Sequence, residues 1–397
     1  MRRAALIASL FITASLAAKS VATRCETQTL PYTTGVQIRR IVSCGDSATD
    51  DTLWHLDRLD SLDGHLDGRF ERTPSTALVY VFDTGVDKNH DEFADGNLIG
   101  GIDAVLLEGE KNDCGDESLN PCLALPQFAL AKSHGTGVAS LIGGRHVGVA
   151  PGTSIVSIHA TSNRYTTWLR ALDETIKHAW LPTTPQVRTA IINMSSQPAF
   201  AVGPGGVGYA DQQKFEAKIR DMVGGVDRDG HPDPDGKRFL FVVAAGNSAE
   251  PTTAGGNRGQ CGPHDEVVLF PSTLGPSIAG LITVGGATRQ NTFWSGSCRG
   301  DAVELLGPAE EVMPAINTGA NDYRLTLDSG NSWSSPIVAG VAALLLTREP
   351  DLSPAELEAR LEATPSVISN PPPGAAGGRM VSTVPRVIPA RRRGARH

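Results

Sequence analysis

The chain has 397 residues, a formal net charge of −8 and 40% hydrophobic residues. The acidic balance gives no reason to expect a nucleic-acid partner, and the apolar content excludes a wholly disordered chain. The length suits one large α/β domain or two smaller ones.

Residues 1–22 have the pattern of a secretory signal peptide. Arg2 and Arg3 precede an apolar stretch from Ala4 to Ala18, and Ser20-Val-Ala22 fits a cleavage site. The apolar stretch is short and has no basic stop beyond it, which argues against a membrane anchor. We therefore expect a secreted, extracellular protein with no stable membrane association.

Six cysteines follow, and an even number in a secreted chain favours disulfides over a metal site. Neighbours along the chain suggest the pairs Cys25–Cys44, Cys114–Cys122 and Cys261–Cys298. Other pairings remain open at this point, because spacing alone does not determine connectivity. No cysteine pair has zinc-like spacing alongside histidines, so we predict no metal ligands.

Apolar, β-rich runs alternate with helical patterns along most of the chain. The expected strands are 77–82, 154–159, 189–194, 239–244 and 281–284, and the expected helices are 133–142, 167–181, 211–223, 335–347 and 353–363. Residues 54–66, which mix apolar residues with Asp and His, are expected on the surface. The alternation predicts an α/β fold with a parallel central sheet flanked by helices on both faces.

The expected domain covers residues 51–366, after a short N-terminal segment at 23–50. Residues 367–397 are rich in Pro and Gly and then basic, which predicts disorder.

The stretch Ser329–Leu346 runs from a serine-rich turn into a small-residue helix. Pro336 fits the first turn of that helix, where a missing N–H costs little. Ser332 then lies beside unpaired helical N–H groups, where a hydroxyl serves either as a cap or as a nucleophile. Ser334 and Ser335 are rival nucleophiles, although their place beside Pro336 puts them inside the helix.

Four residues form a chemical set at one edge of the predicted sheet. Asp83 and Asn247 follow strands, while His134 and Ser332 open the two small-residue helices. In parallel sheets, ligands bind beyond the carboxyl ends of the strands. A carboxylate, an imidazole, a hydroxyl and an amide there can perform acyl transfer. Taken singly, each has a structural reading as a loop carboxylate, a cap or a turn residue.

These residues lie in segments that resemble subtilases, serine peptidases of the subtilisin and proteinase K kind. The similar segments are Val81–Val86, Ser133–Ala139, Gly148–Pro151, Ala244–Asn247 and Gly330–Pro336. The order Asp, His, Ser is that of subtilisin. The similarity covers roughly residues 50–365 and implies the subtilisin-like α/β fold.

The resemblance implies a role for each residue. Ser332 would be the nucleophile, His134 the general base and Asp83 the residue that orients His134. Asn247 would hold the oxyanion together with the N–H of Ser332. Substrate-binding positions would be Ser195, Ala244, Ala245 and Gly246. Ala244–Gly246 would form one wall of the primary pocket, and the apolar run Val267–Phe270 approaches its base. Because neither offers a charge to pair with Lys or Arg, we expect apolar residues at the P1 position of the substrate.

The chain departs from the family's motifs at several positions. Asn331 stands for a usual threonine, Trp333 for a methionine and Gly137 for a frequent histidine. Ser196-Gln-Pro198 replaces the usual Leu-Gly-Gly, which puts pairing with the substrate backbone in question. Residues 23–53 are too few for the inhibitory pro-domain of secreted subtilases.

These observations predict a secreted serine endopeptidase that acts on polypeptides through an acyl-enzyme. We expect a monomer that needs no cofactor for its chemistry; structural Ca²⁺ fits the family, but no ligands are assignable. The alternative is a catalytically silent subtilase fold used as a secreted binding protein. An α/β-hydrolase esterase is disfavoured, because Ser332 lacks the G-x-S-x-G setting.

Overall fold

The computed structural model describes residues 26–30, 38–42, 53–66, 70, 73–107, 126–248, 259–317, 323, 329–363, 366–369, 371 and 378–383. For residues 26–30, 38–42, 106–107, 126–133 and 199 it describes the backbone alone. The predicted signal peptide and the predicted pairs Cys25–Cys44 and Cys114–Cys122 lie outside the described residues. The predicted Cys261–Cys298 disulfide is confirmed.

Seven parallel strands form the central sheet, in the order β11-β10-β8-β6-β3-β5-β4. Their bounds are β3 Leu78–Asp83, β4 Leu98–Asp103, β5 Ser154–His159, β6 Thr189–Met194, β8 Arg238–Ala244, β10 Leu281–Ala287 and β11 Leu305–Pro308. Two small antiparallel pairs accompany it, β1 (Glu26–Leu30) with β2 (Ile38–Val42), and β7 (Ala199–Phe200) with β9 (Leu269–Phe270). The predicted parallel α/β architecture is confirmed.

Both faces of the sheet are covered, which explains why its central strands are mostly apolar and buried. In β3, Val79 and Val81 belong to one buried apolar cluster, and Leu78, Tyr80 and Phe82 to another. The alternation follows from the two-residue period of a strand. All of β3 is therefore buried, and it delivers Asp83 to the sheet edge from a fixed position.

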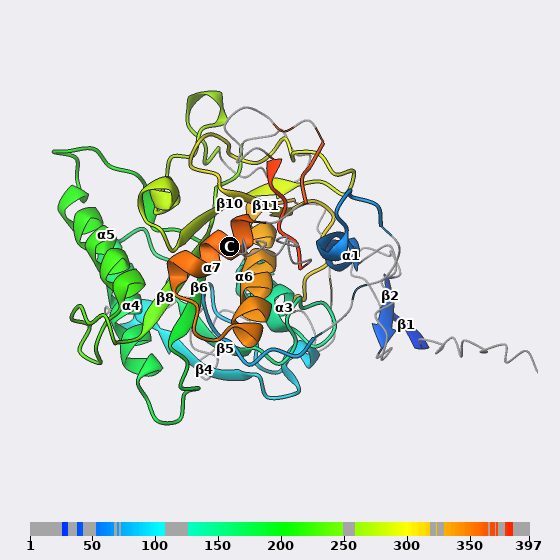
Figure 1. Ribbon diagram of the computed structural model, residues 1–397, viewed down its shortest axis with the longest axis horizontal. Helices are drawn as coiled ribbons and strands as arrows, with labels where there is room; N and C mark the ends of the chain where they lie inside the picture. Colours follow the sequence, from blue (N-terminus) through cyan, green and yellow to red (C-terminus); the bar gives the residue numbers. More distant parts are fainter. Residues whose placement is uncertain are drawn as a thin grey trace, which may run out of the picture.

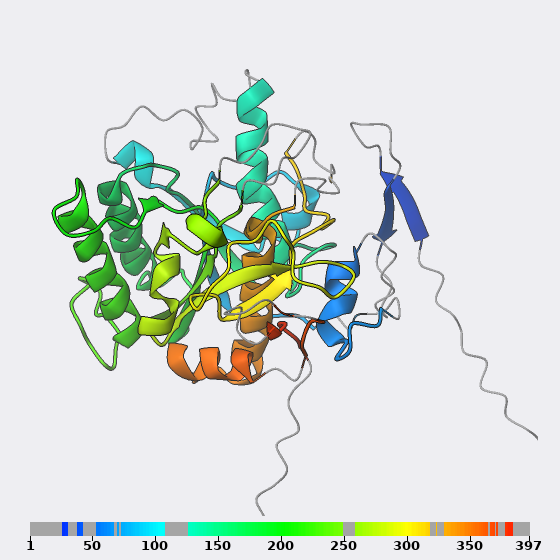
Figure 2. The same ribbon diagram turned by 90° about the horizontal axis from the view of Figure 1, so that it is seen from above.

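The first cluster packs against α3 (Pro126–Gly143) and α6 (Asn331–Arg348), which lie side by side in Figure 1. The second packs against α4 (Tyr165–Ala179) and α5 (Tyr209–Gly224), the green helices of Figures 1 and 2. The remaining helices are α1 (Trp54–Asp60), α2 (Ala104–Leu107) and α7 (Pro354–Glu362), with a 3-10 turn, η2, at Asp91–Phe93. Within the described ranges, no helix has the length and apolar character needed to cross a bilayer.

The expectation that residues 54–66 lie on the surface is confirmed for 60–66, which are exposed or half-buried, and is wrong for 54–59, which helix α1 buries. Trp54 and Arg58 are buried, although polar residues interrupt the apolar pattern here. The indole N–H of Trp54 donates to Glu310 O at 3.1 Å, and Arg58 donates to Asn291 Oδ1 and Ser366 Oγ. Partners from distant segments thus satisfy the polar groups, which the local pattern cannot reveal.

Helix α3 also begins earlier than predicted. His134 was expected to open its helix, but α3 starts at Pro126, so His134 lies in its interior. The helical pattern of the sequence before Ser133 is weak, whereas a proline such as Pro126 suits the first position of a helix.

Predicted disorder over 367–397 is wrong for the part of the tail at 378–383. Met380 and Val381 are fully buried. The N–H of Leu306 donates to Arg379 O and the N–H of Val381 donates to Leu306 O, both at 2.9 Å. Residues 378–383 thus lie along the edge strand β11 and form hydrogen bonds with its otherwise unpaired backbone. These hydrogen bonds order the segment although the residues around it are rich in Pro and Gly.

Candidate active site

Asp83 is the last residue of β3, and its side chain is fully buried. Its Oδ1 lies 2.7 Å from Nδ1 of His134 and accepts a second hydrogen bond from the N–H of Thr84 at 2.8 Å. Strand and helix approach so closely because residue 135 is glycine. A Cβ on Gly135 would lie 2.1 Å from Gly85 O, so a larger residue would push His134 away from the carboxylate.

The contact with Asp83 affects the pKa of His134. Burial lowers the pKa of His134, but the charge of Asp83 and the hydrogen bond to it raise the pKa, and the net effect is upward. The side chain is 29% exposed, so the ring is still accessible from the solvent side. With Nδ1 bound to the carboxylate, Nε2 is the atom that can accept a proton.

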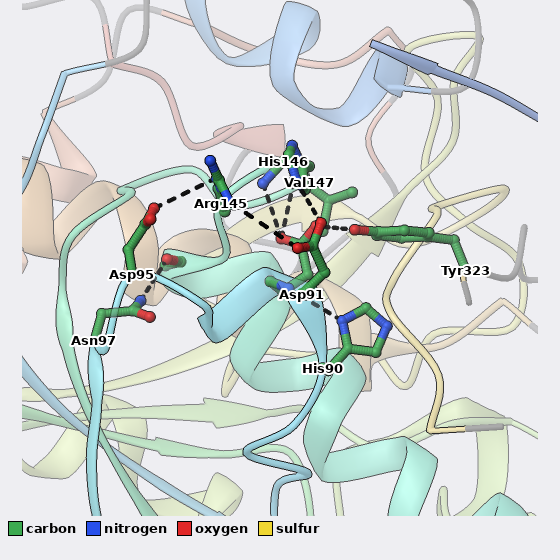
Figure 3. A network of polar contacts seen from close by, with 10 residues as sticks. His90, Asp91, Asp95, Asn97, Arg145, His146, Val147 and Tyr323 are labelled. Atoms are coloured by element: carbon green, nitrogen blue, oxygen red, sulfur yellow. Dashed lines mark hydrogen bonds and ion pairs between the residues drawn. The ribbon is translucent and has the colours of Figure 1, made fainter. Parts of the chain in front are cut away.

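A polar network ties the loop after β3 to the end of α3 (Figure 3). Glu92 is fully buried, and its Oε2 accepts from the N–H groups of His146 at 3.0 Å and Val147 at 3.2 Å. The hydroxyl of Tyr323 donates to Glu92 Oε1, and Asp91 Oδ2 lies 3.0 Å from His146 Nε2. The segment that follows Asp83 and the turn that follows the helix of His134 are therefore fixed to each other. No local motif marks Glu92, so this network could not be predicted from the sequence.

Helix α6 begins at Asn331, four residues before the predicted start at 335, so Ser332 is its second residue and Pro336 lies beyond the first turn. Pro336 has no N–H, so the carbonyl of Ser332 receives no hydrogen bond from it within the helix. Ser195, just past β6, supplies the missing donor: its Oγ donates to Ser332 O at 3.0 Å. The start of α6 is thereby held against the carboxyl end of β6.

The described structure brings Asp83, His134 and the start of α6 together. The ring of Trp333 contacts the ring of His134, with centroids 5.2 Å apart. The hydroxyl of Ser332 itself donates to Ser195 O at 3.3 Å. The Ser332 hydroxyl is therefore directed at the carbonyl of Ser195 in this structure.

Asn247 lies three residues beyond the end of β8, and its side chain has a fixed orientation. Its Oδ1 accepts from the N–H of Asn331 at 2.9 Å, which leaves its Nδ2 as a donor. A Cβ built on Gly330 would lie 3.7 Å from both Asn247 Nδ2 and Ser332 N. Two N–H donors thus border the same space beside Gly330, as an oxyanion site requires.

Asn331 points into the protein instead of toward this space. It is fully buried, and its Nδ2 donates to Gly246 O at 2.6 Å and to Ser297 Oγ at 2.9 Å. The Asn331 side chain therefore orients the segment that precedes Asn247 and offers no further donor to an oxyanion.

The segment Ala244–Gly246 leads from β8 to Asn247. Ala245 is fully buried in a third apolar cluster, and Gly246 has a φ of 95° that favours glycine. The side-chain amide of Gln197 donates to Ala244 O. In the sequence, Gln197 is a departure from the family motif and nothing indicates its contacts. The structure shows that its side chain lies against this segment.

Residues 75–378 match the model of the subtilase family. The chain belongs to the subtilase family. It is 30% identical over 325 residues to the extracellular serine proteinase of Thermus sp. (strain Rt41A), covering 80% of this chain and 63% of that protein. It is 28% identical over 327 residues to the alkaline serine exoprotease A of Vibrio alginolyticus, covering 80% and 48%. The chain thus spans about half to two thirds of these relatives' lengths.

The subtilase fold is also seen in a solved structure. The crystal structure of a cold-adapted subtilisin-like serine proteinase aligns with a TM-score of 0.59 and 25% identity. The alignment covers 85% of this chain and 99% of that chain. The two proteins therefore share the architecture of nearly the whole solved domain.

Two departures from the subtilase motifs fit each other in space. A Cβ on Gly137 would lie 3.0 Å from Cζ3 of Trp333, 3.0 Å from Pro314 Cβ and 3.1 Å from Ala315 O. Gly137 therefore leaves the room that the indole occupies. The histidine frequent at this position in the family would not fit beside Trp333.

Among the described residues, one cluster of three carboxylates is close enough together to hold a cation. Oxygens of Glu304, Glu358 and Glu362 lie within 4.8 Å of one another. Burial is the main cause that raises the pKa of Glu304 to about 8 and that of Glu358 to about 7. Arg379 lies 3.2 Å from Glu362. Bound protons and Arg379 thus offset the negative charge of the three glutamates near neutral pH. The structural Ca²⁺ that the family resemblance suggests stays a prediction.

Proposed function

We propose that this subtilase is a secreted serine endopeptidase that cleaves peptide bonds through an acyl-enzyme on Ser332. The proposal is carried by one observation above all, the 2.7 Å contact between Asp83 and His134 beside the helix that begins with Ser332. The two N–H donors beside Gly330 support it, because both lie 3.7 Å from one point, the position of a Cβ on Gly330, and an oxyanion needs such paired donors.

The chemistry follows from these positions. Ser332 Oγ attacks the peptide carbonyl while its proton moves to His134 Nε2, and the carbonyl oxygen becomes an oxyanion held by Asn247 and the Ser332 N–H. Asp83 keeps the imidazole in the required tautomer and stabilises its charge. His134 then gives the proton to the leaving amine, and the carbon–nitrogen bond breaks. Water repeats the sequence to release the acyl group.

Polypeptide substrates and secretion are proposed on separate grounds. Relatives bear the names extracellular serine proteinase and alkaline serine exoprotease, which supports a polypeptide substrate. The signal-like residues 1–22 and the Cys261–Cys298 disulfide support export to an oxidising environment.

Variants on a peptide substrate test the proposal. Ser332→Ala and His134→Ala should each lower kcat by about 10⁶-fold, a magnitude that comes from subtilisin itself. The double variant should be no worse than either single one, since the two residues act as a unit. Ser334→Ala is the matched control: Ser334 Oγ donates to Gly307 O at 3.1 Å, so its loss should affect stability and spare turnover. Normal turnover in Ser332→Ala would contradict the proposal.

A further inference from the structure

Trp333 stands directly after the proposed nucleophile and lies against the proposed base. Its ring centroid is 5.2 Å from that of His134, and the two rings are tilted by 40°. An aromatic face within about 6 Å of a cation attracts it through the ring quadrupole. The imidazole carries such a charge whenever it holds two protons.

The position of Trp333 is built into two helices. Gly137 lies three residues after His134 in α3, so both residues lie on the same side of the helix. The indole reaches over this turn and fills the space left by the absent Cβ at Gly137. Trp333 also packs, partly buried, against the apolar cluster between α3, α6 and the sheet. Its contact with His134 is therefore held by packing on more than one side.

We propose that Trp333 is a positioning residue for His134, which holds the imidazole against Asp83 and stabilises its doubly protonated form by a cation–π contact. The inference rests on the proposed function. Among the described residues, the charged side chain in contact with His134 is Asp83 from β3, while α6 presents the uncharged indole. The imidazolium thus lies between a carboxylate and an aromatic ring.

The contact acts at one point of the reaction. When the Ser332 oxygen bonds to the substrate carbon, its proton passes to Nε2 of His134, and the charge on the ring appears. The indole face stabilises that charge until the proton leaves with the amine. Loss of the aromatic ring should therefore slow the chemical step and make His134 harder to protonate, with little effect on substrate binding.

The test measures the pKa of His134 directly and does not depend on activity. Imidazole signals are titrated by NMR in the full chain carrying Ser332→Ala, with Trp333 intact or replaced by Met, and His134→Ala identifies the signal. Met is flexible and apolar but has no aromatic face. We expect Trp333→Met to lower the His134 pKa by about 0.5 to 1.5, which is the change that corresponds to the free energy of a cation–π contact. Trp333→Phe should give a smaller decrease.

Trp180→Met serves as the control, because Trp180 lies beneath Lys237 at 5.4 Å and is partly exposed. It should leave the His134 titration unchanged. Gly137→Ala gives a second route should Trp333→Met fail to fold: its methyl displaces the indole and should also lower the His134 pKa. In the active chain, Trp333→Met should lower kcat about 2- to 30-fold with KM nearly constant.

An unchanged His134 pKa in Trp333→Met, or in Gly137→Ala if the first does not fold, overturns the inference. A decrease of kcat without a change of that pKa also overturns it, because simple loss of packing would explain it. Failure of the proposed function would look different, since the wild-type chain would then not hydrolyse peptides whatever the titration shows.

Discussion

The side-chain oxygen of Asn247 accepts a hydrogen bond from the main-chain N–H of Asn331 at 2.9 Å. Asn331 in turn donates from its own side chain to Gly246 O. The end of β8 and the first residue of α6 therefore hold each other in place. This mutual contact fixes which end of the Asn247 amide is free to donate beside Gly330.

Asn247→Asp should abolish most turnover while preserving the fold. The carboxylate can still accept from the Asn331 N–H, but it has lost the donor and adds a negative charge near the oxyanion. We expect kcat to fall at least about 10²- to 10³-fold with little change in KM, because the interaction forms in the transition state. That magnitude comes from subtilisin, a member of the same family. Rates must be normalised by active-site titration, and a kcat within a few-fold of wild type would remove Asn247 from the mechanism.

Activity should rise with pH through a pKa above the ordinary histidine value of 6.5. Asp83 raises the pKa of His134, and a general base works only when it is unprotonated, so activity is lost as pH falls through that raised pKa. Asp83→Asn removes the charge, and the acid limb of kcat/KM should move to lower pH as the overall rate drops. The pH profile of kcat/KM on one peptide substrate checks this. An acid limb below 6.5 in the wild type would contradict the electrostatic account.

The fold should lose stability as pH rises through the neutral range. Burial raises the pKa of Glu304 to about 8 and that of Glu358 to about 7, so the folded state binds these protons more tightly than the unfolded state. The resulting loss of folding stability is absent below pH 4.5, the ordinary pKa of a glutamate, grows as the pH rises above it and is complete above about pH 8. Each kcal/mol lowers Tm by about 2–4 °C in domains of roughly 150–250 residues, and by less in a larger chain such as this one.

Glu304→Gln should reduce this pH dependence, because the amide can still accept from the Thr283 N–H but carries no charge. The exposed Glu266→Gln is the control and should leave the pH dependence as in wild type. Thermal unfolding of the Ser332→Ala background between about pH 5 and 9 avoids self-digestion. Equal pH dependence in Glu304→Gln and wild type would show that Glu304 is not responsible.

Gln197 should restrict the P1 side chain of the substrate. By resemblance to subtilases, Ala244–Gly246 forms one wall of the P1 pocket, and the Gln197 side chain lies across Ala244 O. We expect small apolar P1 residues to be favoured, and Gln197→Gly to raise kcat/KM for Phe relative to Ala at P1 by about tenfold or more. Matched peptide anilides measure the ratio. An unchanged ratio, or a preference for Arg or Lys, would contradict this.

The sequence predicted the sheet best where strands are continuous apolar runs. Strands β5 and β6 have the predicted bounds, because most of their residues are β-branched or otherwise apolar and buried. Strand β4 was missed, since Gly100 and Gly101 weaken its β pattern and its residues are partly exposed. Local patterns thus found the buried centre of the sheet and missed its edges.

The site shows the same limit. Asp83 at a strand end and Ser332 at a helix start follow from local patterns and the subtilase resemblance. The contact between Trp333 and His134 does not, because it depends on space left by Gly137 in another helix. Glu92 likewise looks like any surface acid until its partners at 146, 147 and 323 are known. Contacts between distant segments are the part that local sequence cannot supply.

Covalent labelling shows whether Ser332 is a nucleophile that His134 activates. Purified full-length protein is treated with a fluorophosphonate, and the modified residue is mapped by mass spectrometry. We predict stoichiometric modification of Ser332, lost in His134→Ala and retained in Ser334→Ala. Well-folded protein that is not modified, or is modified at another serine, would contradict the account and favour a catalytically silent subtilase that binds its partners without cleaving them.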